Sequence, residues 1–85
     1  MSVTLLYFAW VRQKIGKSEE TIALPESVKT VGELAAWLAQ RGAGYAEAFS
    51  DAKRLRAALN QEHVGFEARV AADDEIAFFP PVTGG

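Results

Sequence analysis

The strongest constraint on this chain is one well-marked amphipathic helix that begins near residue 30. Thr30 and Glu33 have the spacing of a capping box, in which each side chain accepts a hydrogen bond from the other residue's backbone N–H. Apolar side chains then recur at i, i+3, i+4 and i+7 and form one helical face: Val31, Leu34, Ala35 and Leu38. Gly42, directly after Arg41, predicts the end of the helix. Such a face must be buried against another layer of structure.

Strand-like segments lie on both sides of this helix. The near-continuous apolar run 3–10 predicts a central strand covered on both faces. A helical turn is expected over 11–15, before Gly16, and residues 20–24 alternate so that Ile22 and Leu24 face inward. The second half of the chain predicts a short helix over 43–49, a strand over 55–59, a turn at 60–61, an edge strand over 64–66, a turn at 73–74 and a last strand over 75–79.

This order of elements predicts an α+β fold of the β-grasp (ubiquitin-like) type, a mixed sheet of four to five strands with one main helix on one face. We expect residues 1–79 to form this domain and residues 80–85 to form a flexible C-terminal tail. The apolar runs are too short for a membrane span, and no basic leader precedes the first strand. Together with the lack of Cys, these features favour a cytoplasmic protein. The net charge of −2 argues against nucleic acid as a partner.

The chain ends in a stiff apolar lead followed by two glycines: Pro80, Pro81, Val82, Thr83, Gly84 and Gly85. The two prolines restrict φ and favour an extended exit from the last strand. Gly85 places no side chain beside the terminal carboxylate, and Gly84 provides clearance next to it. Adenylation would give this carboxylate a leaving group, which a sulfur nucleophile could displace. Because the chain has no Cys, its C-terminus is the sensible site for carrying sulfur.

The chain resembles the molybdopterin synthase small subunit, a sulfur-carrier family with a ubiquitin-like fold. The matching segments are 8–12 with Gly16, 30–34, 59–61 and, most specifically, 73–85. The sequence departs from the family pattern at Asp74, where Gly is common, and at His63, where an apolar residue is expected.

This resemblance implies that an activating enzyme uses ATP to adenylate Gly85, and that a sulfur donor protein then supports conversion to a thiocarboxylate. The sulfur is then given to a cyclic pterin precursor to form the molybdopterin dithiolene. The catalytic groups are expected on a large subunit, in a heterotetramer of two large and two small subunits. The chain would therefore be no enzyme on its own, and would hold no permanent cofactor and no metal.

An exposed aromatic surface beside the tail is the expected binding site for the partner. Because side chains alternate along a strand, the aromatic residues near both ends of the chain cannot all face the helix. We predict that the partner-binding residues are Phe8, Arg12 and Phe79, continued by Pro80, Pro81, Val82 and Thr83. Trp37 lies off the apolar helical face and is expected to shield its flank.

Two other functions use the same kind of C-terminus. A sulfur carrier of thiamine biosynthesis is usually shorter and lacks the second helical segment. A ubiquitin-like modifier would join its terminal Gly to a lysine of a target protein. Other candidate chemistry is weak: His63 is the only His, residues 73–75 lack the spacing of a calcium loop, and the basic run 53–56 favours a solvated surface.

Overall fold

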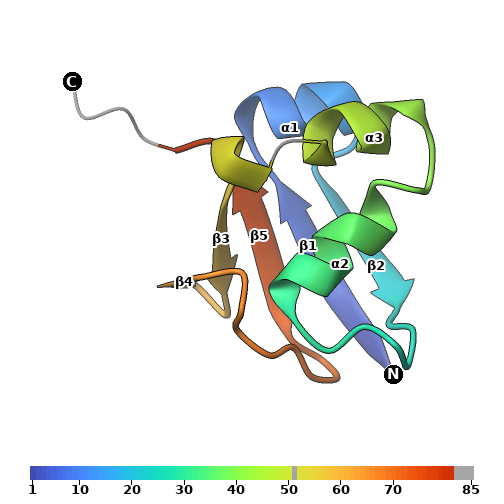
Figure 1. Ribbon diagram of the computed structural model, residues 1–85, viewed down its shortest axis with the longest axis vertical. Helices are drawn as coiled ribbons and strands as arrows, with labels where there is room; N and C mark the ends of the chain where they lie inside the picture. Colours follow the sequence, from blue (N-terminus) through green and yellow to red (C-terminus); the bar gives the residue numbers. More distant parts are fainter. Residues whose placement is uncertain (51, 82–85) are drawn as a thin grey trace.

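The computed structural model describes residues 1–50 and 52–81 as a five-stranded sheet, with one helix across a face and two helices at one end (Figure 1). Its elements are β1 (Ser2–Tyr7), α1 (Ala9–Ile15), β2 (Glu19–Ala23), α2 (Val31–Leu38), α3 (Ala43–Phe49), the 3₁₀ turn η1 (Ala52–Arg54), β3 (Arg56–Leu59), β4 (Glu62–Val64) and β5 (Glu75–Phe79). Helix α2 lies across the sheet, whereas α1 and α3 gather at the end where β1 and β5 finish.

The sheet has the strand order β2-β1-β5-β3-β4. Strands β1 and β5 are parallel neighbours, with Leu5 opposite Ile76 and Tyr7 opposite Phe78, and the other pairs are antiparallel. Parallel neighbours require a crossover connection, and the segment that contains α2 provides it. The predicted β-grasp fold, with a mixed sheet and one main helix on one face, is confirmed.

The core forms where the apolar face of α2 meets one face of the sheet. Thr30 Oγ1 accepts a hydrogen bond from the Glu33 N–H at 3.1 Å, and the Glu33 carboxylate accepts one from the Thr30 N–H, so the predicted capping box is present. All four residues of the predicted helical face are buried, and so are Ile22 and Leu24 of the neighbouring sheet layer. The capped helix therefore begins where the sequence predicts, and it buries the predicted side chains.

The first strand is shorter than predicted. It ends at Tyr7, and the chain turns at Ala9, which has a φ of 53°. Phe8 keeps an extended backbone as the N-cap of α1, and its N–H donates to the Phe78 carbonyl at 3.2 Å. Trp10, which the predicted strand over 3–10 included, therefore lies in a helix. Helix α1 ends at Gly16 as predicted, since this glycine takes the left-handed conformation at φ 89°.

The prediction that the central strand is covered on both faces is wrong for the described residues. Val3, Leu5 and Tyr7 are buried against the helical layer, but Thr4 and Leu6, which alternate with them, are only partly buried. The helical layer lies on one face of the mixed sheet, so the alternate side chains of β1 stay partly exposed on the other face.

The prediction that Gly42 ends the main helix is also wrong. Helix α2 ends at Leu38, and its C-cap Ala39 keeps a right-handed conformation. Gly42 instead begins the next helix as the N-cap of α3. The predicted second helix over 43–49 is confirmed.

The two turns predicted in the second half of the chain are joined by hydrogen bonds. Asn60 and Gln61 both have positive φ and connect β3 to β4, which spans Glu62–Val64 instead of the predicted 64–66. Asp73 also has a positive φ, of 69°. The Asp74 carboxylate accepts hydrogen bonds from the Ala71 N–H at 2.8 Å and from Asn60 Nδ2 at 3.0 Å. Asp at position 74 thus stabilises a turn where relatives of the resembled family often use Gly.

No helix among the described residues is long and apolar enough to cross a membrane.

Candidate functional site: the end of the sheet where the tail begins

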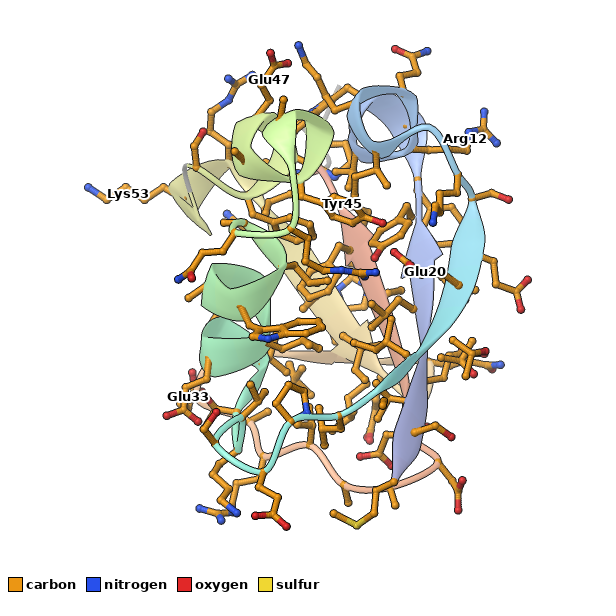
Figure 2. The ribbon with its side chains drawn as sticks, turned by 90° about the vertical axis from the view of Figure 1, so that its right-hand side faces the viewer. Arg12, Glu20, Glu33, Tyr45, Glu47 and Lys53 are labelled. Carbon is orange, nitrogen blue, oxygen red and sulfur yellow. The ribbon has the colours of Figure 1, made fainter. Side chains whose placement is uncertain are left out.

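The predicted partner-binding residues lie at one end of the sheet. Phe8 follows β1 and Phe79 ends β5, and the register of these parallel strands places the two phenylalanines at the same level. Arg12 lies in α1 at this same end (Figure 2). We call Phe8, Arg12, Phe79, Pro80 and Pro81 the tail-exit surface. The fold thus brings together the described residues of the predicted site.

Part of the exposed apolar area lies on this surface. Among the described residues, the exposed large apolar side chains are Met1, at 77% near the start of β1, and Phe8, at 48% on the tail-exit surface. Phe79, Pro80 and Pro81 are each half-buried, and Arg12 is exposed. Residues Val82, Thr83, Gly84 and Gly85 lie outside the described residues. The tail prediction therefore stays a prediction, and so does the boundary between domain and tail at residue 79.

His63 lies beside this surface. It is exposed on β4, and its ring centroid is 5.2 Å from that of Phe79, with the two rings tilted by 55°. The pairing of β3 with both β4 and β5 places His63, Ala58 and Ala77 in one row across the open face. His63 therefore extends the tail-exit surface toward the edge of the sheet, a contact that sequence reasoning did not predict.

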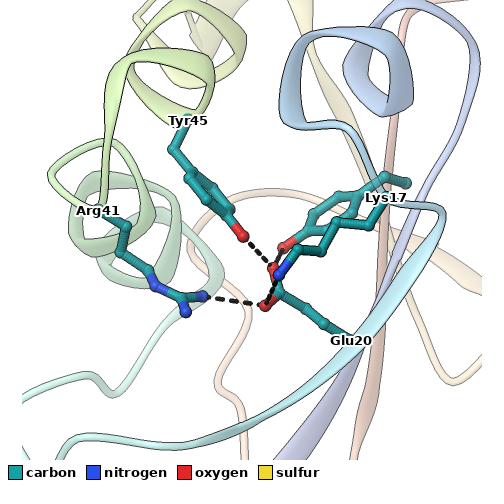
Figure 3. A network of polar contacts seen from close by, with 5 residues as sticks. Lys17, Glu20, Arg41 and Tyr45 are labelled. Carbon is teal, nitrogen blue, oxygen red and sulfur yellow. Dashed lines mark hydrogen bonds and ion pairs between the residues drawn. The ribbon is translucent and has the colours of Figure 1, made fainter.

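A polar network joins α3 and the loop before it to strands β1 and β2 (Figure 3). The Glu20 carboxylate, on the helical side of β2, accepts hydrogen bonds from the Tyr7 and Tyr45 hydroxyls, both at 2.7 Å. Its other oxygen lies 3.2 Å from Arg41 Nη1 and 3.5 Å from Lys17 Nζ. The side chain of Glu20 is only 10% exposed. One carboxylate thus ties β1 and β2 to α3 and to the loop before it.

These contacts shift the pKa values of the groups in the network. Partial burial alone would raise the pKa of Glu20, but the hydrogen bonds from Tyr45 and Tyr7, with the charges of Arg41 and Lys17, outweigh it and lower that pKa. Burial and the hydrogen bond to Glu20 raise the pKa of both tyrosines. At neutral pH the network therefore holds an ionised carboxylate between two protonated phenols. It stabilises structure and offers no group poised for proton transfer.

The described residues show no cluster that would hold a metal ion: within 1–50 and 52–81, no three His, Asp or Glu side chains converge. The acidic run 73–75 serves its turn, as the bonds of Asp74 show.

Comparison with known proteins agrees with this arrangement. The family model described as the ThiS family matches residues 5–85, which includes the terminal glycine pair. The molybdopterin synthase sulfur carrier subunit of Escherichia coli (strain K12) is 40% identical over 83 residues, covering 98% of this chain and 99% of that protein. The chain belongs to the ThiS family. The resemblance inferred from the sequence motifs is confirmed.

Solved structures show the same fold. SAMP1 from Haloferax volcanii superimposes with a TM-score of 0.73 at 24% identity, covering 100% of both chains. A chain from the complex of subunits 1 and 2 of the molybdopterin-converting factor from Helicobacter pylori 26695 superimposes with a TM-score of 0.66 at 24% identity, again over 100% of both chains. At this level of identity the two likenesses establish the β-grasp architecture of the chain.

Proposed function

We propose that this protein is the sulfur-carrier subunit of a molybdopterin synthase. The observation that carries the proposal is the 40% identity with a molybdopterin synthase sulfur carrier subunit over almost the full length of both proteins. The Gly-Gly terminus supports it, because an unhindered terminal carboxylate is the chemistry that such a carrier needs. Helix α3 also favours this function over the thiamine sulfur carrier, which usually lacks a second helical segment.

In the proposed reaction, the Gly85 carboxylate attacks the α-phosphate of ATP on an activating enzyme and releases pyrophosphate. Sulfide delivered by a donor protein then displaces AMP from the acyl adenylate and leaves a thiocarboxylate. The thiocarboxylate sulfur bonds to a carbon of the cyclic pterin precursor, and water hydrolyses the resulting thioester, so that the sulfur stays on the pterin and Gly85 returns to a carboxylate. The chain holds no permanent cofactor in this cycle, and it works in the cytoplasm, where ATP is available.

The large subunit binds the tail-exit surface and supplies the catalytic groups, in a heterotetramer of two large and two small subunits. The complex of subunits 1 and 2 in the Helicobacter pylori structure supports a two-protein assembly of this kind. The exposed Phe8 and half-buried Phe79 beside the start of the tail support the position of the interface. Apolar residues of this size are typical of the centre of a protein interface.

The experiment is the intact mass of the chain after incubation with its activating enzyme, ATP and a sulfur source. We expect the gain that corresponds to replacement of one carboxylate oxygen by sulfur. The matched variant lacks Gly85, which draws the carboxylate back by about 3.3–3.6 Å, the length of one extended residue. A misplacement of about 1 Å can already cost on the order of 100-fold in rate, so this variant should remain unmodified. Attachment of the intact chain to a lysine of another protein, with no sulfur gain, would instead identify a modifier.

A further inference from the structure

Charge is distributed unevenly along this molecule, although its net charge is only −2. Cations lie at the tail end: Arg56 pairs with Phe79 at the end of β5, and Arg12 lies in α1 (Figure 2). Acidic residues gather at the opposite end, which also holds Lys29 and Arg69: the Asp73 N–H donates to the Ser2 carbonyl at 2.7 Å, Asp74 and Glu75 follow, and Glu26 lies in the same pocket as the two cations. The tail therefore begins at the positive end of the chain.

The strongest feature of the positive end is an open groove of about 520 Å³ between α1, α3 and η1. We call it the basic groove, and its lining residues are Trp10, Lys14, Glu47, Ser50 and Arg54. The Arg54 guanidinium carbon lies 5.2 Å from the centroid of the Trp10 ring. Lys14 Nζ lies 3.0 Å from Glu47 Oε2, and about half or more of each of these two side chains is exposed to solvent.

This arrangement favours a carboxylate as the ligand. A guanidinium stacked on an aromatic ring uses its flat face for the contact, so the N–H groups at its edge can still donate in the fork that matches a carboxylate. The stacking also restrains Arg54 before any partner arrives. The exposed Lys14–Glu47 pair contributes little to stability, so its ammonium can be shared with an incoming carboxylate at small cost.

The basic groove is continuous with the tail-exit surface. Trp10 follows Phe8 by two residues at the start of α1, and Arg54 ends η1 two residues before Arg56, which pairs with Phe79. The groove and the tail-exit surface therefore lie at the same end of the molecule, within reach of one partner. Charge separation of this kind would turn the chain tail-first toward an acidic surface as it approaches.

We propose that the large subunit inserts carboxylate side chains of Asp or Glu into the basic groove, with Arg54 as their main contact. This inference rests on the proposed function, since it takes the large subunit as the protein that covers the tail-exit surface. The groove contact speeds and orients association, and the apolar tail-exit surface provides most of the binding free energy.

The test is the association rate constant of the full-length chain with purified large subunit, measured by stopped flow at low and high salt. The variants are Arg54→Glu and the matched control Arg69→Glu, an exposed arginine near the opposite end of the molecule. Both make the same change in net charge. We expect Arg54→Glu to slow association about tenfold at low salt, with a smaller difference at high salt, because steered association weakens as salt screens it. Arg69→Glu should change the rate less than twofold.

Equal effects of the two variants would overturn the inference, because net charge and not the groove would then set the rate. A slowing by Arg54→Glu that appears only with the activating enzyme would also overturn it, since the groove would then belong to the other partner. The proposed function has a separate readout. If wild-type thiocarboxylated chain and large subunit bind but yield no molybdopterin, the proposed function fails while the comparison of association rates still stands.

Discussion

Replacing Glu20 by Gln should destabilise the fold by about 2–3 kcal/mol. The change keeps the shape of the side chain but turns a charged acceptor into a neutral amide. Hydrogen bonds to a charged group contribute about 1.5–3 kcal/mol and neutral ones about 0.5–1.5, so the bonds from Tyr7 and Tyr45, both 2.7 Å long, should each lose about 1 kcal/mol. The contacts with Arg41 and Lys17 are more exposed and add at most about 0.5 kcal/mol each.

The assay is thermal and urea unfolding of the wild-type and Glu20→Gln chains at several pH values. For a domain of 85 residues, a loss of 2–3 kcal/mol corresponds to a melting temperature lower by roughly 10–20 °C. Because the folded chain lowers the pKa of Glu20 from its ordinary value of 4.5, ionised Glu20 stabilises the fold above that pH. This stabilisation is lost as the pH falls through the folded-state pKa. The difference between the two chains should therefore be constant from pH 7 to about 5 and decrease at lower pH.

The matched control is Glu19→Gln on the same strand, where the side chain is exposed. It removes the same charge, and it should change stability by less than about 0.5 kcal/mol. A Glu20→Gln chain that unfolds together with the Glu19→Gln chain would refute the reasoning. So would a difference that increases as the pH falls, because the ionised carboxylate would then not be the stabilising species.

Two further predictions concern the tail-exit surface and the helices beside it. Phe79→Asp should weaken binding to the large subunit by at least roughly 30-fold, because a central apolar side chain of the interface is lost. The circular dichroism spectrum should stay unchanged. An equal loss of binding for Thr21→Asp, on edge strand β2, would contradict a specific role for Phe79. Gly44→Ala should destabilise the chain by about 1–3 kcal/mol in urea unfolding, because its Cβ would overlap the Lys14 carbonyl oxygen of α1; unchanged stability would show that α1 and α3 are not tightly packed.

The elements that the sequence predicts best are those set by local spacing. The capping box at Thr30 and the last strand over 75–79 depend on residues only a few positions apart, and both are present as predicted. The end of β1 could not be read in this way, because the apolar run continues through Trp10. The backbone turn at Ala9 leaves no mark in that run, since Ala has no special preference for positive φ.

The candidate site likewise has one part that the sequence predicts and one part that it does not. Phe8 and Phe79 could be predicted as neighbours because they follow or end strands that the fold places side by side. The Glu20 network was missed, although its signal was present: Glu20 shares the inward face of β2 with Ile22, where a carboxylate needs partners. Three of those partners could not be identified from the sequence, because Tyr7, Arg41 and Tyr45 are 13, 21 and 25 residues away.

The central claim is that Gly85 carries sulfur to a pterin, and one single-turnover experiment tests it most directly. Thiocarboxylated chain is mixed with purified large subunit and the cyclic pterin precursor, and the intact mass of the chain and the amount of molybdopterin are followed together. Because a dithiolene contains two sulfur atoms and each chain carries one, two chains should return to the carboxylate mass for every molybdopterin formed. Chains that keep their sulfur, or that become linked to a lysine while no molybdopterin appears, would contradict the account.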